Sequence, residues 1–311
     1  MEQLKTIYCK YDMVCEAPSG GGIEIVRMPD FFVEKQDIES VYAHVHNFYE
    51  IVWFIEGNGV HYVDFKEYSV SDNTLFFIAP GQVHSFDNNH NQKGFVLKVC
   101  HDLFDGISGD DMTLMKFDLF NADSVPYHHI KNEEAEKLKN IIENIEDENY
   151  QFDKIGHKEF LKALVRMMII IIERGSNGQE NRVLNVNKTS HKTFLLFRQL
   201  LEQNYRELHT VSDYAKLLKI STKTLNNYIS DCSPLSPLEI INGRIILEAK
   251  RMLRYTDLMI KEIGYKLGFE DPSYFVKFFK RETNLLPISF REQFNNATVN
   301  IPKEIDCNCC R

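Results

Sequence analysis

The sequence lacks a long apolar run, a secretion signal and an excess of basic residues. Its longest uninterrupted apolar stretch, residues 167–172, is far shorter than the ~18 residues or more that a membrane span needs. The N-terminus has no basic segment followed by an apolar core, so no signal peptide is expected. The seven cysteines lack the spacing of a disulfide framework, which indicates reduced thiols. These absences predict a cytoplasmic protein with no membrane partner.

Charge is distributed unevenly along the 311 residues. The formal net charge of −9 would by itself argue against binding to nucleic acid. Residues 190–295, however, hold 16 Lys and Arg against 12 Asp and Glu, and the remainder holds 20 basic against 33 acidic residues. The length suggests about two domains. The sequence therefore indicates an acidic module joined to a mildly basic one.

The basic module contains two predicted helix-turn-helix units. Apolar spacing predicts short helices over residues 260–267 and 273–281, with a stop at Gly268 and Phe269 between them. A first unit is predicted upstream, from a short helix after the capping pattern at residues 210–213 and a second helix from Ser221 to Ile229. A longer helix is predicted before it, over residues 194–208. In such a unit the second helix enters the major groove of DNA.

A longer C-terminal motif runs through the second unit. Its residues are Gly268-Phe269-Glu270-Asp271, Ser273-Tyr274-Phe275, Phe279-Lys280-Arg281, Thr283, Pro287 and Phe290-Arg291, with Arg244, Ala249 and Leu253 in a predicted helix upstream. This motif resembles the signature of the arabinose-regulator (AraC/XylS) family of transcription factors, in which the upstream helix is the linker helix.

Three positions depart from the family pattern. Asn284 stands where the family has Gly, and Asn tolerates the left-handed conformation. Leu286 replaces the usual Ser or Thr, so the last helix is expected to lack its usual N-cap. Pro234 replaces Gly and cannot take a positive φ, so that turn must differ locally.

Exposed positions on the two recognition helices are the candidates for reading DNA. In the first unit these are Lys223, Asn226 and Asn227, because Lys suits guanine acceptors and Asn suits adenine. In the second unit they are Pro272, Ser273, Val276 and Lys277, with Lys280 beside them. Lys277 and Lys280 could equally contact phosphates, which position a protein on DNA without specifying a sequence. A solvated basic face is the alternative for any single lysine.

The acidic module is predicted to be a small barrel or jelly roll. Residues 23–99 read as short strands separated by turns at residues 57–59, 71–73 and 80–81. Within them, His44, His46, Glu50 and Gly57, followed by Pro80-Gly81, His84 and Asn88, resemble the two cupin motifs, although Pro80 and Gly81 adjoin where cupins separate them. On one continuous strand, His44, His46 and Glu50 would point to the same face.

Two interpretations of this cluster compete. Three histidines and a carboxylate are a credible transition-metal site, whereas the sensor domains of the resembled family usually bind small effectors without a metal. We therefore expect no metal, no cofactor and no catalytic residue, and an effector pocket lined by His44, His46, Glu50, His84 and Trp53. A metal-dependent cupin enzyme fused to a DNA-binding module is the alternative function. An inert interaction barrel is a third.

Two further helices are predicted, over residues 132–150 and 157–174. The second becomes apolar on all faces at residues 167–172, so it must be buried against the barrel or against a partner subunit. We predict a homodimer through this helix and take Met168 and Ile172 as members of its exposed face.

The predicted fold class is a multidomain α+β protein. A cupin-like sensor domain over residues 1–130 is followed by a helical dimerisation region (131–175), a polar linker (176–190), a DNA-binding domain with two helix-turn-helix motifs (191–295) and a cysteine-containing tail (296–311). The predicted function is sequence-specific regulation of transcription under the control of a small-molecule effector. The expected partners are a double-stranded DNA operator, the effector and a second copy of the chain, and RNA polymerase is a further candidate.

Overall fold

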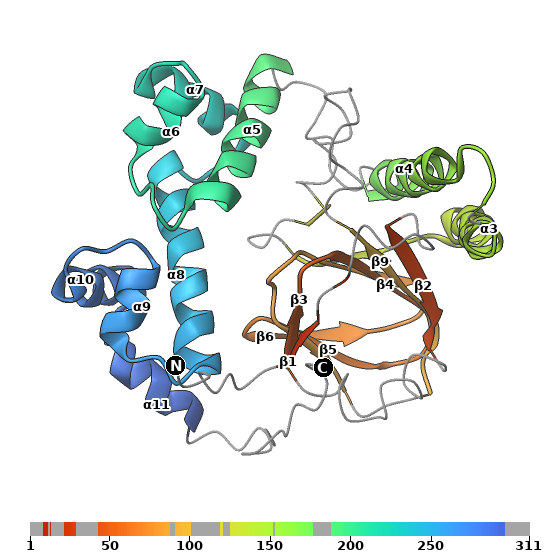
Figure 1. Cartoon of the computed structure of the whole chain (residues 1–311), viewed down its shortest axis with the longest axis horizontal. Coiled ribbons are helices and arrows are strands. Elements are labelled where there is room, and N and C mark those ends of the chain that lie inside the picture. The colour runs from red at the N-terminus through yellow and green to blue at the C-terminus, as the bar shows by residue number, and fades with distance from the viewer. Residues whose placement is uncertain are drawn as a thin grey trace. The chain divides into compact units, whose positions relative to one another are not determined.

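The computed structural model divides into two compact units, one spanning residues 9–182 and the other residues 183–311 together with residues 1–8 (Figure 1). It describes residues 9–11, 13, 22–28, 43–87, 91–100, 119–120, 125–151, 153–176 and 188–295. Among these residues, no helix is long and apolar enough to cross a membrane. The predicted tail and Asn88 lie outside the described residues.

The N-terminal unit contains two five-stranded sheets in its described part. Their strand orders are β1-β3-β8-β5-β6 and β10-β7-β4-β9-β2. The strands are β1 (Cys9–Tyr11), β2 (Ile23–Arg27), β3 (His44–His46), β4 (Tyr49–Glu56), β5 (Gly59–Val63), β6 (Lys66–Val70), β7 (Thr74–Ile78), β8 (His84–Phe86), β9 (Lys93–Val99) and β10 (Tyr127–His129).

The predicted turns of this unit are confirmed. Gly57 and Asn58 connect β4 to β5, and Asn73 takes a left-handed φ of 57° immediately before β7. Gly81, between β7 and β8, has a φ of 74°, and its N–H donates to the carbonyl oxygen of His46 at 2.8 Å. This bond ties the turn of the second cupin-like motif to the strand that carries the first. Cys100, directly after β9, is disulfide-bonded, so the expectation of reduced thiols is wrong for this residue.

His44 and Glu50 do not lie on one continuous strand, which corrects the sequence-based expectation. A bend at residues 47–48 separates β3 from β4, and the two strands belong to different sheets. The chain thus crosses from one sheet to the other between the histidines and the carboxylate. The side chains of His44, His46 and Glu50 are nevertheless all buried, because the two sheets face each other across the same interior.

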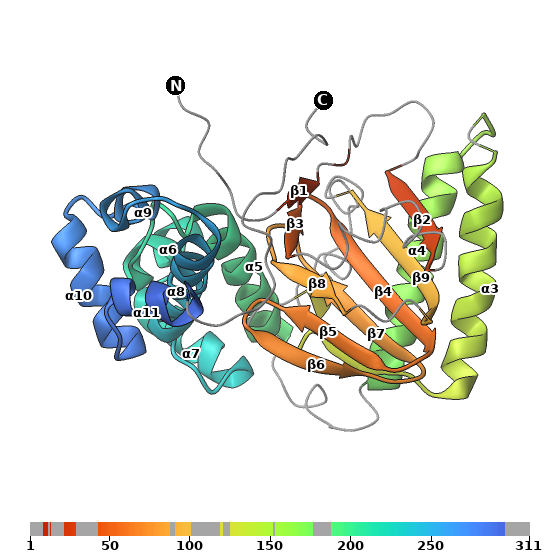
Figure 2. The same ribbon diagram turned by 90° about the horizontal axis from the view of Figure 1, so that it is seen from below.

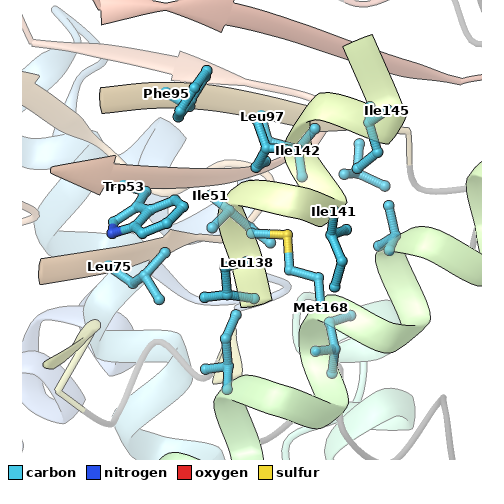
Figure 3. Close-up of a cluster of buried hydrophobic side chains, with 14 of the residues drawn as sticks. Ile51, Trp53, Leu75, Phe95, Leu97, Leu138, Ile141, Ile142, Ile145 and Met168 are labelled. Atoms are coloured by element: carbon cyan, nitrogen blue, oxygen red, sulfur yellow. The ribbon is translucent and has the colours of Figure 1, made fainter. Parts of the chain in front are cut away.

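The two faces of β4 belong to two different apolar cores. Val52 and Phe54 pack with residues of both sheets in the interior, whereas Ile51 and Trp53 face outward. The outward face is covered by α3 (Asn132–Asn149) and α4 (His157–Ser176), which run beside β2, β4 and β9 (Figure 2). Figure 3 shows Ile51, Trp53, Leu75, Phe95 and Leu97 of the sheet meeting Leu138, Ile141, Ile142, Ile145 and Met168 of the helices.

The residues predicted on the exposed face of α4 are in fact buried. Met168 and Ile172 are 1% and 0% exposed and belong to the core beneath the helices. Phe160 and Met167 are large apolar residues of α4 that face outward, with exposures of 48% and 51%. The sequence pattern could not separate these faces because the run at residues 167–172 is apolar on every side.

The C-terminal unit consists of seven helices in its described part. They are α5 (Lys188–Asn204), α6 (Val211–Leu217), α7 (Thr222–Cys232), α8 (Pro237–Tyr255), α9 (Ile260–Lys266), α10 (Pro272–Thr283) and α11 (Pro287–Asn295). Helix α5 begins and ends earlier than predicted, and its first residues fall within the predicted linker. The α+β architecture, with a β-sheet unit followed by an all-helical unit, is confirmed.

Local capping explains where several of these helices begin and end. The hydroxyls of Thr210 and Ser221 accept N–H groups at the starts of α6 and α7, and Ser236 and Glu239 form a capping box at the start of α8. Asn284 ends α10 with a left-handed φ of 61°, as predicted. Ser233 leaves α7 in an extended conformation (φ −142°), so the turn containing Pro234 does differ from a glycine turn.

Candidate DNA-binding surface and sensor cluster

The first helix-turn-helix unit is built from α6 and α7. Tyr214 and Ala215 of α6 and Leu225 and Ile229 of α7 are buried, which fixes the inner faces of both helices. Lys219 makes the turn between them with a φ of 56°. The predicted reading residues of α7, which are Lys223, Asn226 and Asn227, are all exposed. The Asn226 side-chain amide donates to the carbonyl oxygen of Thr222 at 2.8 Å within the same helix.

The second unit is built from α9 and α10. Gly268 turns the chain with a φ of 80°, and a Cβ atom there would lie 2.0 Å from the carbonyl oxygen of Arg206. Phe275 and Phe279 anchor α10 from the inside, as predicted. Gly264 of α9 packs so closely that a Cβ would lie 3.2 Å from that of Phe275. Small residues therefore allow the two helices to approach each other.

Helix α10 presents a mixed outer surface. Ser273, Lys277 and Lys280 are exposed, and Pro272 and Val276 are half-buried. Tyr274 is also exposed and lies next to Ser273 on the first turn. Tyr274 was not among the residues predicted to read DNA. Its helical spacing of four residues to Phe278, which is buried, gave no sequence signal for an outward orientation.

A buried charge network connects the long helix α8 to α5. The Arg244 guanidinium lies 2.8 Å from a carboxylate oxygen of Glu202 and 3.2 Å from one of Glu248, and its centre lies 3.9 Å above the ring of Tyr205. Arg206 and Arg251 reach Glu248 at 3.2 and 3.6 Å. Burial works against ionisation of Glu248, but these three guanidiniums hold the pKa of its carboxyl below the ordinary value. Arg244, part of the motif upstream, therefore has a structural role.

Arg291, another residue of the C-terminal motif, also has a structural role. Its guanidinium donates to the carbonyl oxygens of Leu253 and Leu258 at 2.9 and 2.7 Å. These carbonyls lie near the end of α8 and in the segment before α9, where backbone acceptors need partners. Arg291 thus fastens α11 to the end of α8.

In the N-terminal unit, the structure brings His44, His46, Glu50 and His84 together, as the two motifs predicted. His44 pairs with His84 across β3 and β8, with ring centroids 4.1 Å apart. The His84 Nε2 atom lies 3.7 Å from Oε1 of Glu50. His61 of β5 joins the cluster, since its Nε2 lies 3.4 Å from Nδ1 of His84. The five side chains are buried.

Burial lowers the pKa of His46, His61 and His84 and keeps these three imidazoles neutral. Removal from water, and secondarily the neighbouring His44, lowers the pKa of both His46 and His61 to about 3. The same two causes lower the pKa of His84 well below its ordinary value. Neutral imidazoles can accept a hydrogen bond or bind a metal through one ring nitrogen.

Trp53 is not part of the cluster. It lies on the opposite face of β4 from Glu50 and packs beneath α3 and α4 (Figure 3). Strand alternation predicts this separation, because residues 50 and 53 differ in parity. His61 was missed because nothing in the sequence around it shows that β5 pairs with β8.

Comparison with known protein families identifies both units. Residues 32–165 match the AraC-like ligand binding domain, and residues 214–293 match a helix-turn-helix domain. The chain belongs to the AraC family of transcriptional regulators. AraC-family proteins are transcription factors and not enzymes, so the alternative of a cupin enzyme fused to a DNA-binding module is wrong. As an AraC-family regulator, the protein binds DNA through its C-terminal unit and has a ligand-binding N-terminal domain.

Two named relatives and one solved structure align with most of this chain. The HTH-type transcriptional activator RhaS of Enterobacter sp. (strain 638) is 25% identical over 80% of this chain and 87% of its own length. RhaS of Escherichia coli (strain SE11) is 23% identical with the same coverage. Among solved structures, ToxT from Vibrio cholerae is 14% identical, with a TM-score of 0.37 over 87% of this chain and 97% of its own.

Proposed function

We propose that this AraC-family regulator recognises a specific operator through α7 and α10. The observation that carries the proposal is the division of each helix into a buried inner face and an exposed outer one. Leu225 and Ile229 hold α7 from the inside, and Lys223, Asn226 and Asn227 stand outward. A helix anchored in this way can enter a major groove with its polar face toward the base edges.

The exposed residues fall into two roles. Asn226 and Asn227 suit the adenine edge, and Lys223 suits guanine acceptors, so α7 would read bases. On α10, Ser273 and Val276 suit base contacts, with Pro272 at the start of the helix beside them. Lys277 and Lys280 suit phosphates, because an ammonium group on a flexible stem binds phosphate as a point charge. The two helices would occupy successive major grooves, about 34 Å apart on one face of the DNA.

Control by a small-molecule effector is the second part of the proposal. The N-terminal unit buries a polar cluster of His44, His46, Glu50 and His84 between its sheets. Buried polar groups inside a barrel can orient a small ligand, so an effector would bind against this cluster. Binding would then shift the equilibrium between DNA-competent and DNA-incompetent arrangements.

A homodimer is the third part. The outward stripe of α4, which contains Phe160, Ala163 and Met167 with the half-buried Ile170, is apolar at helical spacing. Two copies joined through this stripe would place two DNA-binding units on one operator.

Because the RhaS relatives carry the name of transcriptional activators, we further propose that this protein activates transcription through contact with RNA polymerase.

Selection of bound sites from random double-stranded DNA tests the proposal. The full chain should enrich a recurring sequence with two elements about one helical turn apart, and pools of candidate metabolites should change the yield of bound DNA. Enrichment of no sequence would refute specific recognition. A recurring site whose yield no metabolite pool changes would refute the effector and favour an inert interaction barrel.

A further inference from the structure

Three side chains from three strands converge inside the N-terminal unit. His46 lies at the end of β3, Glu50 near the start of β4 and His84 at the start of β8. One ligand atom from each lies within 4.8 Å of the other two, and all three residues are buried. His44 is close to the ring of His84 but is not in this convergent set. Two imidazoles and one carboxylate form a donor set typical of divalent first-row transition metals.

The orientation of the two imidazoles is fixed from behind. His46 Nδ1 lies 2.7 Å from the carbonyl oxygen of Phe48, so it must carry the proton and donate, which leaves the lone pair on Nε2. His84 Nδ1 faces Nε2 of His61 at 3.4 Å. A ring nitrogen held by a neighbouring group while the other points into a shared space is the usual arrangement of a metal-binding histidine.

The inward nitrogens have no hydrogen-bond partner among the described residues. Nε2 of His46 and Nε2 of His84 are both fully buried and unsatisfied within that part of the chain. Leaving a buried polar atom unsatisfied destabilises the folded state, so two such nitrogens aimed into one space call for an explanation. The separation of 3.7 Å between His84 Nε2 and Glu50 Oε1 exceeds a hydrogen bond but leaves room for an ion between them.

We propose that Nε2 of His46, Oε1 of Glu50 and Nε2 of His84 bind one divalent transition-metal ion, with His61 positioning the ring of His84. This replaces the sequence-based expectation of a metal-free pocket. That expectation treated four polar residues as a general lining, whereas the structure selects three and aims their ligand atoms at one point. The proposal is independent of operator recognition.

Metal titration of the full chain tests the proposal. Cys307, Cys309 and Cys310 are first changed to Ser, because tail thiols would compete for metal. After removal of metal with a chelator, calorimetric titration with Zn²⁺ and visible absorption with Co²⁺ should both show one ion per chain. His46→Gln and His84→Gln should each abolish this binding. His61→Leu should weaken it about 10–100-fold, as expected for loss of a positioning group.

His157→Gln is the matched control, because His157 is also buried and lies beside a carboxylate, with Nδ1 3.0 Å from Oε1 of Glu148, but outside the barrel. It should retain full binding. Fluorescence of Trp53, the single tryptophan, reports whether each variant has folded. If His46→Gln or His84→Gln fails to fold, metal binding by the other of these two variants tests the proposal. Absence of a bound ion in the parent, or stoichiometric binding that survives in a folded His46→Gln or His84→Gln variant, would overturn the proposal.

Discussion

At the scale of single residues, Gly268 is held in a conformation and a space that only glycine suits. Its φ of 80° is in the left-handed region, and a Cβ would meet the carbonyl oxygen of Arg206. The backbone conformation alone would cost a larger residue about 1–3 kcal/mol. We therefore expect Gly268→Ala to destabilise the C-terminal unit by more than about 2 kcal/mol. Thermal unfolding followed by far-UV circular dichroism measures this change.

Gly243 is the matched control for that substitution. It lies on the exposed side of α8, and a Cβ there would meet no atom within 4 Å. Gly243→Ala should stabilise the unit by about 0.5–1 kcal/mol, because alanine favours the helix. In both variants the fluorescence transition of Trp53 should stay unchanged, since this residue reports on the N-terminal unit. Equal unfolding temperatures for the two variants would contradict the assigned role of Gly268.

Residue patterns predicted the exposed face of α7 better than they predicted the neighbours within the sensor cluster. Lys223, Asn226 and Asn227 could be placed on the outer face of α7 because helical spacing is a local property. His61 could not be predicted, because its neighbour His84 is brought close only by the pairing of β5 with β8. Trp53 was assigned to the pocket by its aromatic character alone. The alternation of side chains along β4 already argued against that assignment.

At the scale of elements, the buried carboxylate of Glu248 compensates the charge of Arg244, the residue that joins α8 to Glu202 of α5. Removal of one partner from a buried ion pair costs about 3–5 kcal/mol, because the opposite charge is left without compensation. Glu248→Gln should lower the free energy of unfolding of the C-terminal unit by about this amount at neutral pH. Glu207→Gln, an exposed carboxylate in the same unit, is the control and should have little effect.

The pH dependence of this unit follows from the same carboxylate. The pKa of Glu248 is lower in the folded chain than its ordinary value of 4.5 in the unfolded chain. Its stabilising contribution is therefore complete above pH 4.5 and is lost as the pH falls through the folded value. Denaturant titrations between neutral and acid pH should show a steeper loss of stability in the parent than in Glu248→Gln. Parallel curves would contradict the role of Glu248.

Elements with a strong local period were predicted closely, and those at a bend were not. The amphipathic pattern placed α3 and α4 within about two residues at each end. The single strand expected around residues 44–50 is in fact β3 and β4, divided between two sheets. A bend at residues 47–48 is not visible in a continuous run of strand-forming residues, because it depends on which sheet each half joins.

At the scale of the whole molecule, the proposed homodimer depends on the outward stripe of α4. Phe160→Glu combined with Met167→Glu places two charges in the proposed interface without disturbing the core, since both side chains are about half exposed. We expect a folded monomer with weakened operator binding, measured by sedimentation and DNA titration. Tyr150→Glu with Ile155→Glu, two exposed apolar residues between the helices, is the control and should remain dimeric. A doubly substituted α4 that sediments as a dimer would place the interface elsewhere.

The test of sequence-specific recognition by α7 is the affinity of Lys223→Ala and Asn226→Ala for a selected operator. Fluorescence anisotropy of labelled DNA gives the dissociation constants for the operator and for a scrambled duplex at one salt concentration. Each substitution should cost about 1–3 kcal/mol on the operator and less on the scrambled duplex. Gln203→Ala, on the exposed face of α5, should bind as the parent does. If both α7 variants bind the operator with the parent's affinity, the assignment of α7 as a recognition helix is wrong.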